Sequence, residues 1–202
     1  MSRMNPLLEP LEPRRLFALT GLWTFNDGTP NDSVGGNHAV LFNGASISNG
    51  RLFLQNPGVT SGQSTLVQYA QLPAGVIPDS GSVSINVWYN TFSAVPQWMR
   101  VFDFGTKNGT GGRNYLYFSP LSSSSDARAV IRPGSVASAD VTATTARANQ
   151  GYQRMATVVV DATSRQYNLY LDGTLASTVP LGGVTLADVQ DSLNYLGRSL
   201  WD

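Results

Sequence analysis

Residues 153–179, QRMATVVVDATSRQYNLYLDGTLASTV, contain three β-strand patterns joined by two tight turns, and this stretch constrains the fold most strongly. Apolar or aromatic side chains stand at every second position from Tyr167 to Leu171, which is typical of a strand with two different faces. Asp172 and Gly173 follow as a two-residue turn, because both residue types tolerate the positive φ angles of a tight hairpin. Consecutive antiparallel strands of this kind predict a sheet that buries one face against a second sheet.

Strand and turn patterns continue over the rest of the chain, with one helical turn expected at residues 186–192. The predicted strands are residues 22–25, 38–42, 51–55, 65–69, 82–89, 99–104, 115–119, 127–132, 154–160, 166–171, 175–179 and 194–197. Turn pairs such as Asn43-Gly44 separate most of them. Every second residue from Val83 to Tyr89 is expected to face the core. Many short strands with regular turns favour an all-β sandwich or jelly roll over a βαβ fold.

Charge and composition exclude several classes of function. The formal net charge is zero, with 13 basic and 13 acidic side chains and no basic stripe, so nucleic acid is not a predicted partner. The chain has no cysteine, which excludes disulfides, thiolate zinc sites and cysteine nucleophiles. No apolar run approaches the roughly 20 residues of a membrane helix, so we predict no membrane insertion.

Residues 1–20 differ in composition from the rest, and they contain the glutamates of the whole chain, Glu9 and Glu12. The repeated Leu-Glu-Pro and the following Arg14 and Arg15 resemble the LEPR-type leader of many large bacterial surface or secreted proteins. We therefore expect a disordered leader at residues 1–20 and one domain at residues 21–202. The resemblance implies an extracellular or cell-surface protein with further domains.

Several blocks from residue 21 to the end resemble, in their order, a known family. They are GLWTFND at 21–27, SVSINVWY at 82–89, QWMRVFDFG at 97–105, the ATVVVD and YNLYLDG pair, and NYLGRS at 194–199. This series is similar to the LamG-like (laminin G type 3) concanavalin A-like lectin/glucanase domains. The resemblance implies a jelly-roll sandwich of two antiparallel sheets. Because the family usually continues with one further strand after the final block, we expect this jelly roll to lack its last strand.

The jelly-roll family includes glucanases, which hydrolyse glycosides with two carboxylates. Here no glutamate follows Glu12, and most aspartates fall in predicted turns, where they hydrogen-bond local backbone. Asp103 stands alone on a predicted strand, and we expect Arg100, Arg113 or backbone N–H groups to satisfy it. The sequence therefore predicts no enzyme.

Other catalytic arrangements lack the residues they need. His38, the single histidine, cannot build a zinc site, and no G-x-S-x-G sequence marks a serine nucleophile. Residues 105–112, GTKNGTGG, lack the Gly-Lys-Ser/Thr ending of a phosphate-binding loop. We expect His38 to be a polar edge residue and residues 105–112 to form a flexible hairpin loop.

Calcium is the cofactor that the sequence supports best. Residues 26–32, NDGTPND, concentrate side-chain oxygens, and calcium takes six to eight oxygen ligands. The predicted metal ligands are Asp27, Asp32 and Asn37. The alternative is a loop closed by Asx turns, in which the same oxygens accept local backbone hydrogen bonds.

Aromatic residues are the strongest candidates for ligand binding, because the C–H faces of sugars pack on aromatic rings. The candidate ligand-binding residues, on strands predicted to be neighbours, are Trp88, Trp98, Tyr115 and Tyr117. For each of them the alternative is a place in the core. Trp23 and Trp201, near the two ends of the domain, are expected to pack together.

The sequence therefore predicts a non-catalytic extracellular module for recognition or adhesion, which binds a glycan or a protein as part of a larger protein. Two alternatives stay open. One is a structural spacer, and the other is a divergent glycoside hydrolase or its accessory carbohydrate-binding module.

Overall fold

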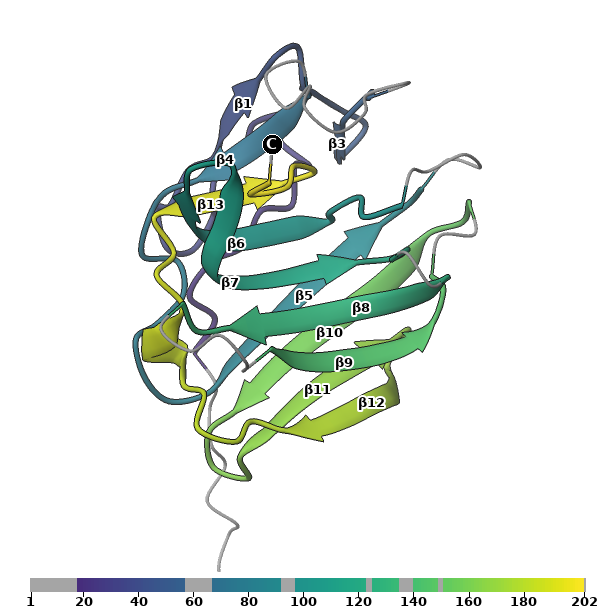
Figure 1. Ribbon diagram of the computed structural model, residues 1–202. Coiled ribbons are helices and arrows are strands. Elements are labelled where there is room, and N and C mark those ends of the chain that lie inside the picture. Colours follow the sequence, from purple (N-terminus) through teal and green to yellow (C-terminus); the bar gives the residue numbers. More distant parts are fainter. Residues whose placement is uncertain are drawn as a thin grey trace, which may run out of the picture.

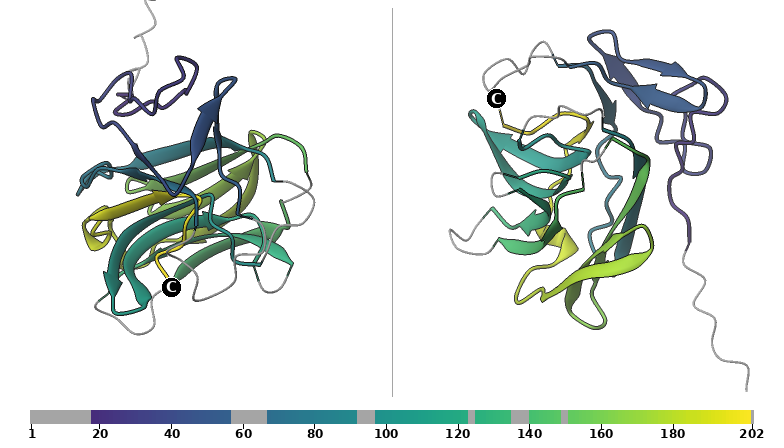
Figure 2. Two further views of the ribbon diagram at one scale, coloured as in Figure 1. Left: turned by 90° about the horizontal axis from the view of Figure 1, so that it is seen from above. Right: turned by 90° about the vertical axis from the view of Figure 1, so that its right-hand side faces the viewer.

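The computed structural model describes residues 18–56, 67–91, 97–122, 125–134, 140–148 and 151–201. Two antiparallel sheets of seven and four strands face each other, with a two-stranded sheet at one end. Figure 1 looks onto the seven-stranded sheet with the four-stranded sheet behind it, and Figure 2 shows the two layers from the side. The predicted jelly-roll sandwich of two antiparallel sheets is confirmed.

The seven-stranded sheet has the order β1 (Val40–Phe42), β4 (Tyr69–Leu72), β13 (Leu193–Leu196), β6 (Phe102–Asn108), β7 (Gly111–Ser119), β8 (Asp126–Arg132) and β9 (Val141–Ala146). The four-stranded sheet has the order β12 (Thr174–Pro180), β11 (Gln166–Leu171), β10 (Arg154–Asp161) and β5 (Val83–Tyr89). The short β2 (Ser46–Ser48) and β3 (Arg51–Phe53) pair with each other. A 3-10 turn, η2 (Leu186–Asp188), precedes β13.

The main core lies between the two large sheets and follows the period-two patterns. The buried residues of the four-stranded sheet include Ala156, Val158, Val160, Tyr167 and Leu169, and those of the seven-stranded sheet include Phe102, Phe104, Leu116, Phe118, Ala129 and Ile131. Full burial of one such large side chain stabilises the fold by about 1.5–3 kcal/mol. Alternate residues from Val83 to Tyr89 pack against this core from edge strand β5, as the alternation predicted.

A second apolar cluster lies on the outer face of the seven-stranded sheet, the face turned away from the four-stranded sheet. Its buried members are Tyr69, Tyr115, Tyr117, Val130, Tyr195 and Leu200. The strand register places Tyr195, Asp103 and Tyr117 opposite one another on β13, β6 and β7. The C-terminal end lies on this outer side of the sheet (Figure 2), and Leu200 is completely buried there. An interior-like surface thus forms outside the sandwich.

Some predicted element boundaries were wrong. Residues 22–25 form no strand, because Phe25 has a φ of 59° and its carbonyl accepts a turn hydrogen bond from the N–H of Gly28. Two strands, β2 and β9, were not predicted; β9 reads VTATTA and so lacks the large apolar side chains that signal alternation. The predicted strand at 65–69 begins outside the described residues, and β4 covers Tyr69–Leu72 instead.

Residues 1–17 of the predicted leader lie outside the described residues, so its expected disorder and the domain boundary stay predictions. In the part of the chain that the structure describes, no helix has the length and apolarity to cross a bilayer.

Candidate functional site

Arg100 lies at the centre of the outer face and is only 6% exposed. Its Cζ atom is 3.9 Å from the centroid of the Tyr117 ring. Its Nε donates a hydrogen bond to Oδ2 of Asp103 at 3.1 Å, and its Nη1 donates one to the Trp98 carbonyl at 2.7 Å. A buried guanidinium needs such partners, because an unpaired buried charge is very costly.

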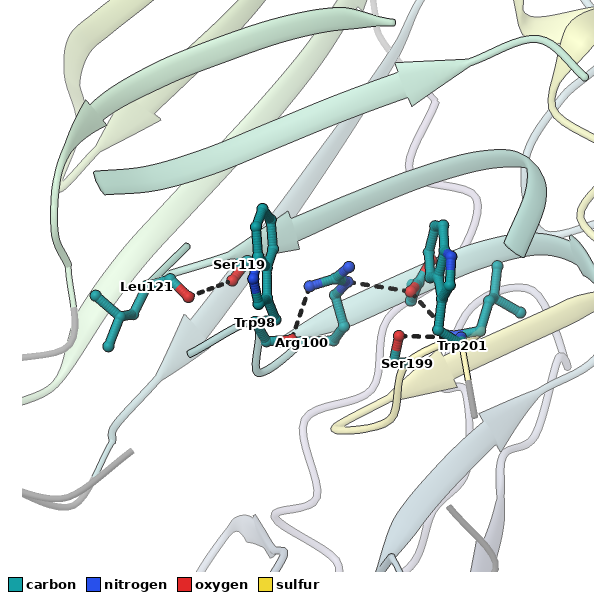
Figure 3. A network of polar contacts seen from close by, with 8 residues as sticks. Trp98, Arg100, Ser119, Leu121, Ser199 and Trp201 are labelled. Atoms are coloured by element: carbon teal, nitrogen blue, oxygen red, sulfur yellow. Dashed lines mark hydrogen bonds and ion pairs between the residues drawn. The ribbon is translucent and has the colours of Figure 1, made fainter. Parts of the chain in front are cut away.

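Two indole rings stand on either side of this guanidinium, as Figure 3 shows. Arg100 Cζ lies 5.7 Å from the ring centroid of Trp98 and 5.5 Å from that of Trp201. Trp98 has a φ of 65°, a backbone conformation that is strained for a bulky residue and that often marks functional sites. A hydrogen bond of 2.7 Å from its N–H to the Leu121 carbonyl holds this conformation. Trp98 remains 38% exposed and Trp201 is partly exposed, so both rings are accessible.

Asp103 is the buried acid of the site. Its Oδ2 also accepts a hydrogen bond from the Leu200 N–H at 3.0 Å, while its Oδ1 has no partner among the described residues. Burial is the largest influence on its pKa and raises it to about 7, against the opposing effects of Arg100 and the Leu200 N–H. The expectation that an arginine or backbone N–H groups satisfy Asp103 is confirmed for Oδ2, which binds both Arg100 and the Leu200 N–H.

Tyr115 and Tyr117 form the floor beneath Trp201. They are 3% and 5% exposed, and their rings stack with centroids 5.5 Å apart. The Trp201 ring meets them edge-on, at 4.8 Å from Tyr115 and 6.3 Å from Tyr117. Burial raises the pKa of Tyr117 to about 12. Both tyrosines therefore support the surface from below, as the core alternative proposed.

The structure brings Trp98, Tyr115 and Tyr117 together but leaves Trp88 apart. Trp88 lies on β5 of the four-stranded sheet and is 64% exposed. The expectation that all four aromatics lie on neighbouring strands is wrong for Trp88, because β5 and β7 belong to different sheets. It is also wrong for Trp98, which lies in a turn that precedes β6. Trp23 and Trp201 do not pair either, since Trp23 packs against the inter-sheet core and Trp201 against the outer cluster.

Sequence reasoning missed the arginines of this face and the role of Trp201. On β8, Ala127, Ala129 and Ile131 face the inter-sheet core, whereas Val130 belongs to the outer cluster. Arg128 and Arg132 stand two residues from Val130 and therefore share its outer face. Arg128 Cζ is 5.3 Å from the centroid of the Trp98 ring, and Arg128 pairs with Asp126 at 3.3 Å. The alternating sequence DARAVIR carried the signal, but only strand register places these arginines beside the aromatics.

In the loop of the predicted calcium ligands, Asp32 is buried and its oxygens already bind the backbone. Oδ1 accepts hydrogen bonds from the N–H groups of Leu22 at 2.8 Å and Val34 at 2.9 Å, and Oδ2 accepts one from Asn37 at 3.1 Å. Burial raises the pKa of Asp32, but these backbone hydrogen bonds outweigh it and lower the pKa to about 2. Both carboxylate oxygens of Asp32 therefore already accept hydrogen bonds from backbone N–H groups.

Asp27 and Asn37, the other predicted ligands, also form hydrogen bonds within the protein. The exposed Asp27 accepts hydrogen bonds from the N–H and hydroxyl of Thr29 at 3.0 and 2.7 Å, and these bonds lower its pKa. The backbone carbonyl of Asn37 accepts a hydrogen bond from Trp23 Nε1 at 2.9 Å. The backbone N–H of Asp32 donates a hydrogen bond to His38 Nδ1 at 3.1 Å. Within the described ranges, no group of three or more His, Cys, Asp or Glu side chains is placed to hold a metal ion. Calcium binding here stays a prediction.

Residues 63–202 match the family described as the concanavalin A-like lectin/glucanases superfamily. This match begins later than the resemblance expected from residue 21. A comparison with curated proteins found no match. One similar solved structure is domain 4 of AbnA, a GH43 extracellular arabinanase from Geobacillus stearothermophilus, in complex with arabinotriose. The two share a TM-score of 0.64 and 14% sequence identity, and the match covers 91% of this chain and 84% of the AbnA domain chain. The binding domain of botulinum neurotoxin serotype D has a TM-score of 0.55 and 10% identity over 86% of this chain and 43% of its own. The chain belongs to the concanavalin A-like lectin/glucanases superfamily.

Proposed function

We propose that this chain is a non-catalytic carbohydrate-binding module whose ligand lies on the outer face of the seven-stranded sheet. The observation that carries the proposal is the pair of accessible indole rings, Trp98 and Trp201, on either side of the Arg100 guanidinium (Figure 3). Sugar rings pack their C–H faces on such rings, and a guanidinium donates hydrogen bonds to oxygen acceptors.

The donor for a ligand is Nη2 of Arg100. Nε and Nη1 of Arg100 bind Asp103 and Trp98, whereas Nη2 donates no hydrogen bond among the described residues. Nη2 is also not among the fully enclosed atoms that lack a partner, so it keeps some contact with solvent. A donor that is held rigidly from below loses little conformational entropy on binding, which favours affinity.

Similarity in fold to domain 4 of the extracellular arabinanase AbnA, solved with arabinotriose, supports a glycan ligand. It also supports our proposal that this module works outside the cell, attached to a larger surface or secreted protein. A protein ligand and a purely structural spacer are the outcomes that a failure to bind glycans would favour.

The state of the carboxylates on this face supports a role without catalysis. A glycoside hydrolase needs two carboxyl groups about 5–9.5 Å apart across the scissile bond. Asp103 is completely buried beneath Arg100, and Asp126 and Asp140 pair with Arg128 and Arg132. Asp103 is therefore enclosed, and the other two carboxylates are held in ion pairs with arginines of the same face.

The test is binding of arabinotriose and a broad glycan array to the whole chain, followed by calorimetry on the glycans that bind. Trp98→Ala and Trp201→Ala should each weaken binding about 10- to 30-fold, the effect typical of a central aromatic contact. Trp88→Ala is the matched control, because Trp88 is an exposed tryptophan on the other sheet. Equal affinities of Trp98→Ala and Trp88→Ala, or no glycan binding by the wild-type chain, would refute the proposal.

A further inference from the structure

A groove opens beside Trp201, at the end of the hairpin that joins β6 and β7. It consists of two adjoining depressions of about 290 and 530 Å³ that share Asn108, Arg113 and Gly134 in their walls. The smaller depression also contains Trp201 and Arg132. The groove therefore continues the aromatic surface proposed above to bind sugars.

Arg113 brings an uncompensated positive charge to this groove. Its side chain is exposed, and among the described residues its guanidinium forms no ion pair and donates no hydrogen bond. Gly134 makes room for it, because a Cβ atom at Gly134 would lie only 2.7 Å from Cγ and Nε of Arg113. The Arg113 side chain thus lies against the backbone of Gly134, and a larger residue at position 134 would displace it.

A second arginine lies in the smaller depression. Arg132 lines it together with Arg113 and Trp201, and Arg132 pairs with Asp140 at 3.2 Å. Asp188 lines the larger depression, where one of its oxygens accepts hydrogen bonds from the N–H and hydroxyl of Thr185 at 2.8 and 3.0 Å. These neutral donors leave its negative charge in place, so the smaller depression is the positive end of the groove. Arg113 and Arg132 lie together in the smaller depression, whose described lining contains no carboxylate, and an anion bound there would reduce the repulsion between them.

Glycines set the aromatic wall of the groove. A Cβ atom on Gly112 would lie 2.7 Å from the Trp201 ring, so the ring lies directly against the backbone of β7. Gly111 and Gly112 come from the glycine-rich segment at residues 105–112. Most of this segment lies on β6 and β7, not in the expected hairpin loop, and Gly112 makes space there for an indole ring next to two arginines.

We propose that the ligand is an acidic glycan, with one sugar ring packed against Trp201 and its carboxylate bound by Arg113 and Arg132. A guanidinium matches a planar carboxylate with two parallel hydrogen bonds, and Arg113 has these donors free. This inference rests on the proposed function, because it names the class of glycan that the same surface takes.

The experiment compares oligosaccharides of galacturonate, glucuronate, mannuronate and sialic acid with the methyl ester of each, by calorimetry on the whole chain. The acids should bind and their esters should bind at least about tenfold more weakly, the scale of a lost charged hydrogen bond. Arg113→Gln should weaken binding of the acid by about 10- to 100-fold and binding of the ester by a clearly smaller factor, because the ester keeps only a neutral acceptor. Arg113→Lys should recover part of the loss, since it keeps the charge but not the paired donors. Arg51→Gln is the charge-matched control, on β3 outside the groove.

Each outcome decides between the two proposals. Esters that bind as well as acids, or an Arg113→Gln variant that behaves like Arg51→Gln, would overturn the acidic-ligand assignment. Sulfated oligosaccharides that bind more tightly than carboxylates would overturn the choice of carboxylate. If only neutral glycans bind, and Trp98→Ala weakens them, the carbohydrate-binding function stands and this inference falls. If no glycan of any charge binds, both fall.

Discussion

Asp103 and Leu200, 97 residues apart in the chain, are joined by a hydrogen bond of 3.0 Å from the Leu200 N–H to Oδ2 of Asp103. The same oxygen accepts a hydrogen bond from Arg100 Nε at 3.1 Å. One buried carboxylate therefore holds both the guanidinium between the indole rings and the segment that carries Trp201. The place of Trp201 beside Arg100 depends on this group, whereas Trp98 is also held by the hydrogen bond from its N–H to the Leu121 carbonyl.

Asp103 should make stability depend on pH. Burial raises its pKa to about 7, whereas an aspartate in an unfolded chain has a pKa of about 3.9. Between about pH 4 and 7 the folded state thus keeps a proton that the unfolded state releases. The contribution of Asp103 to the free energy of unfolding is full below about pH 4 and is lost as the pH rises towards 7.

Urea unfolding of the wild type and of Asp103→Asn across this pH range measures the effect. The variant lacks the titrating group, so the difference in free energy of unfolding between the two proteins should change steadily with pH. Using the difference removes the contribution of the other carboxylates. A difference that stays constant from pH 4 to 7 would contradict the elevated pKa.

Gly112→Ala should displace Trp201 without straining the backbone. The new Cβ atom would lie 2.7 Å from the indole ring, and Gly112 has no positive φ that only glycine tolerates. We expect a shift in tryptophan fluorescence and a loss of glycan affinity comparable with that of Trp201→Ala. Gly183→Ala is the matched control, because a Cβ atom there has no neighbour within 4 Å. Unchanged fluorescence and affinity in Gly112→Ala would show that Trp201 does not rest on this strand.

Tyr167→Phe should stabilise the protein, unlike most core substitutions. The Tyr167 side chain is completely buried, and its hydroxyl has no hydrogen-bond partner in the described part of the molecule. Removal of a buried unsatisfied hydroxyl should raise the free energy of unfolding by about 1 kcal/mol. Tyr89→Phe is the comparison, since the Tyr89 hydroxyl donates a hydrogen bond of 2.8 Å to the Ala148 carbonyl. It should lower the free energy of unfolding by about 1 kcal/mol. Equal losses in both variants, measured by chemical denaturation, would refute this prediction.

Asp32→Ala should destabilise the protein by about 2 kcal/mol at neutral pH, because the carboxylate accepts backbone hydrogen bonds that lower its pKa to about 2. This stability is present above about pH 4, the unfolded pKa, and is lost as the pH falls towards 2. The difference in free energy of unfolding between the wild type and Asp32→Ala should therefore shrink in acid. A difference independent of pH would contradict the lowered pKa.

The calcium hypothesis for this loop has its own test. Since backbone N–H groups already bind the Asp32 carboxylate, we expect the loop to keep its shape without metal and the melting temperature to be unchanged by EGTA. A melting temperature that rises with calcium and falls with EGTA would establish a metal site. In that case Asp27→Asn should abolish the response, because Asp27 is the exposed carboxylate of the loop.

Local patterns predicted the strands well where large apolar residues alternate. The Asp172-Gly173 turn and the strands around it formed as expected, and so did the core-facing side of β5. A partner for Asp103 was also predictable, since a lone carboxylate on a strand needs one, but the sequence left Arg100, Arg113 and backbone N–H groups open. Strand β9 was not predicted, because its alanine and threonine residues differ little in hydrophobicity and so give no clear alternation between its two faces.

Sequence alone determined the strands, their two faces and the absence of a glutamate pair, because side-chain alternation and composition are properties of the chain itself. The tertiary structure decided which strands became neighbours. It separated Trp88 from Tyr115 by placing their strands in different sheets, and it brought Trp201 across the chain onto Tyr115. A period of two says which way a side chain points but not which strand lies beside it. Pairing between distant strands is set by long-range packing and hydrogen bonding, and that pairing built the site.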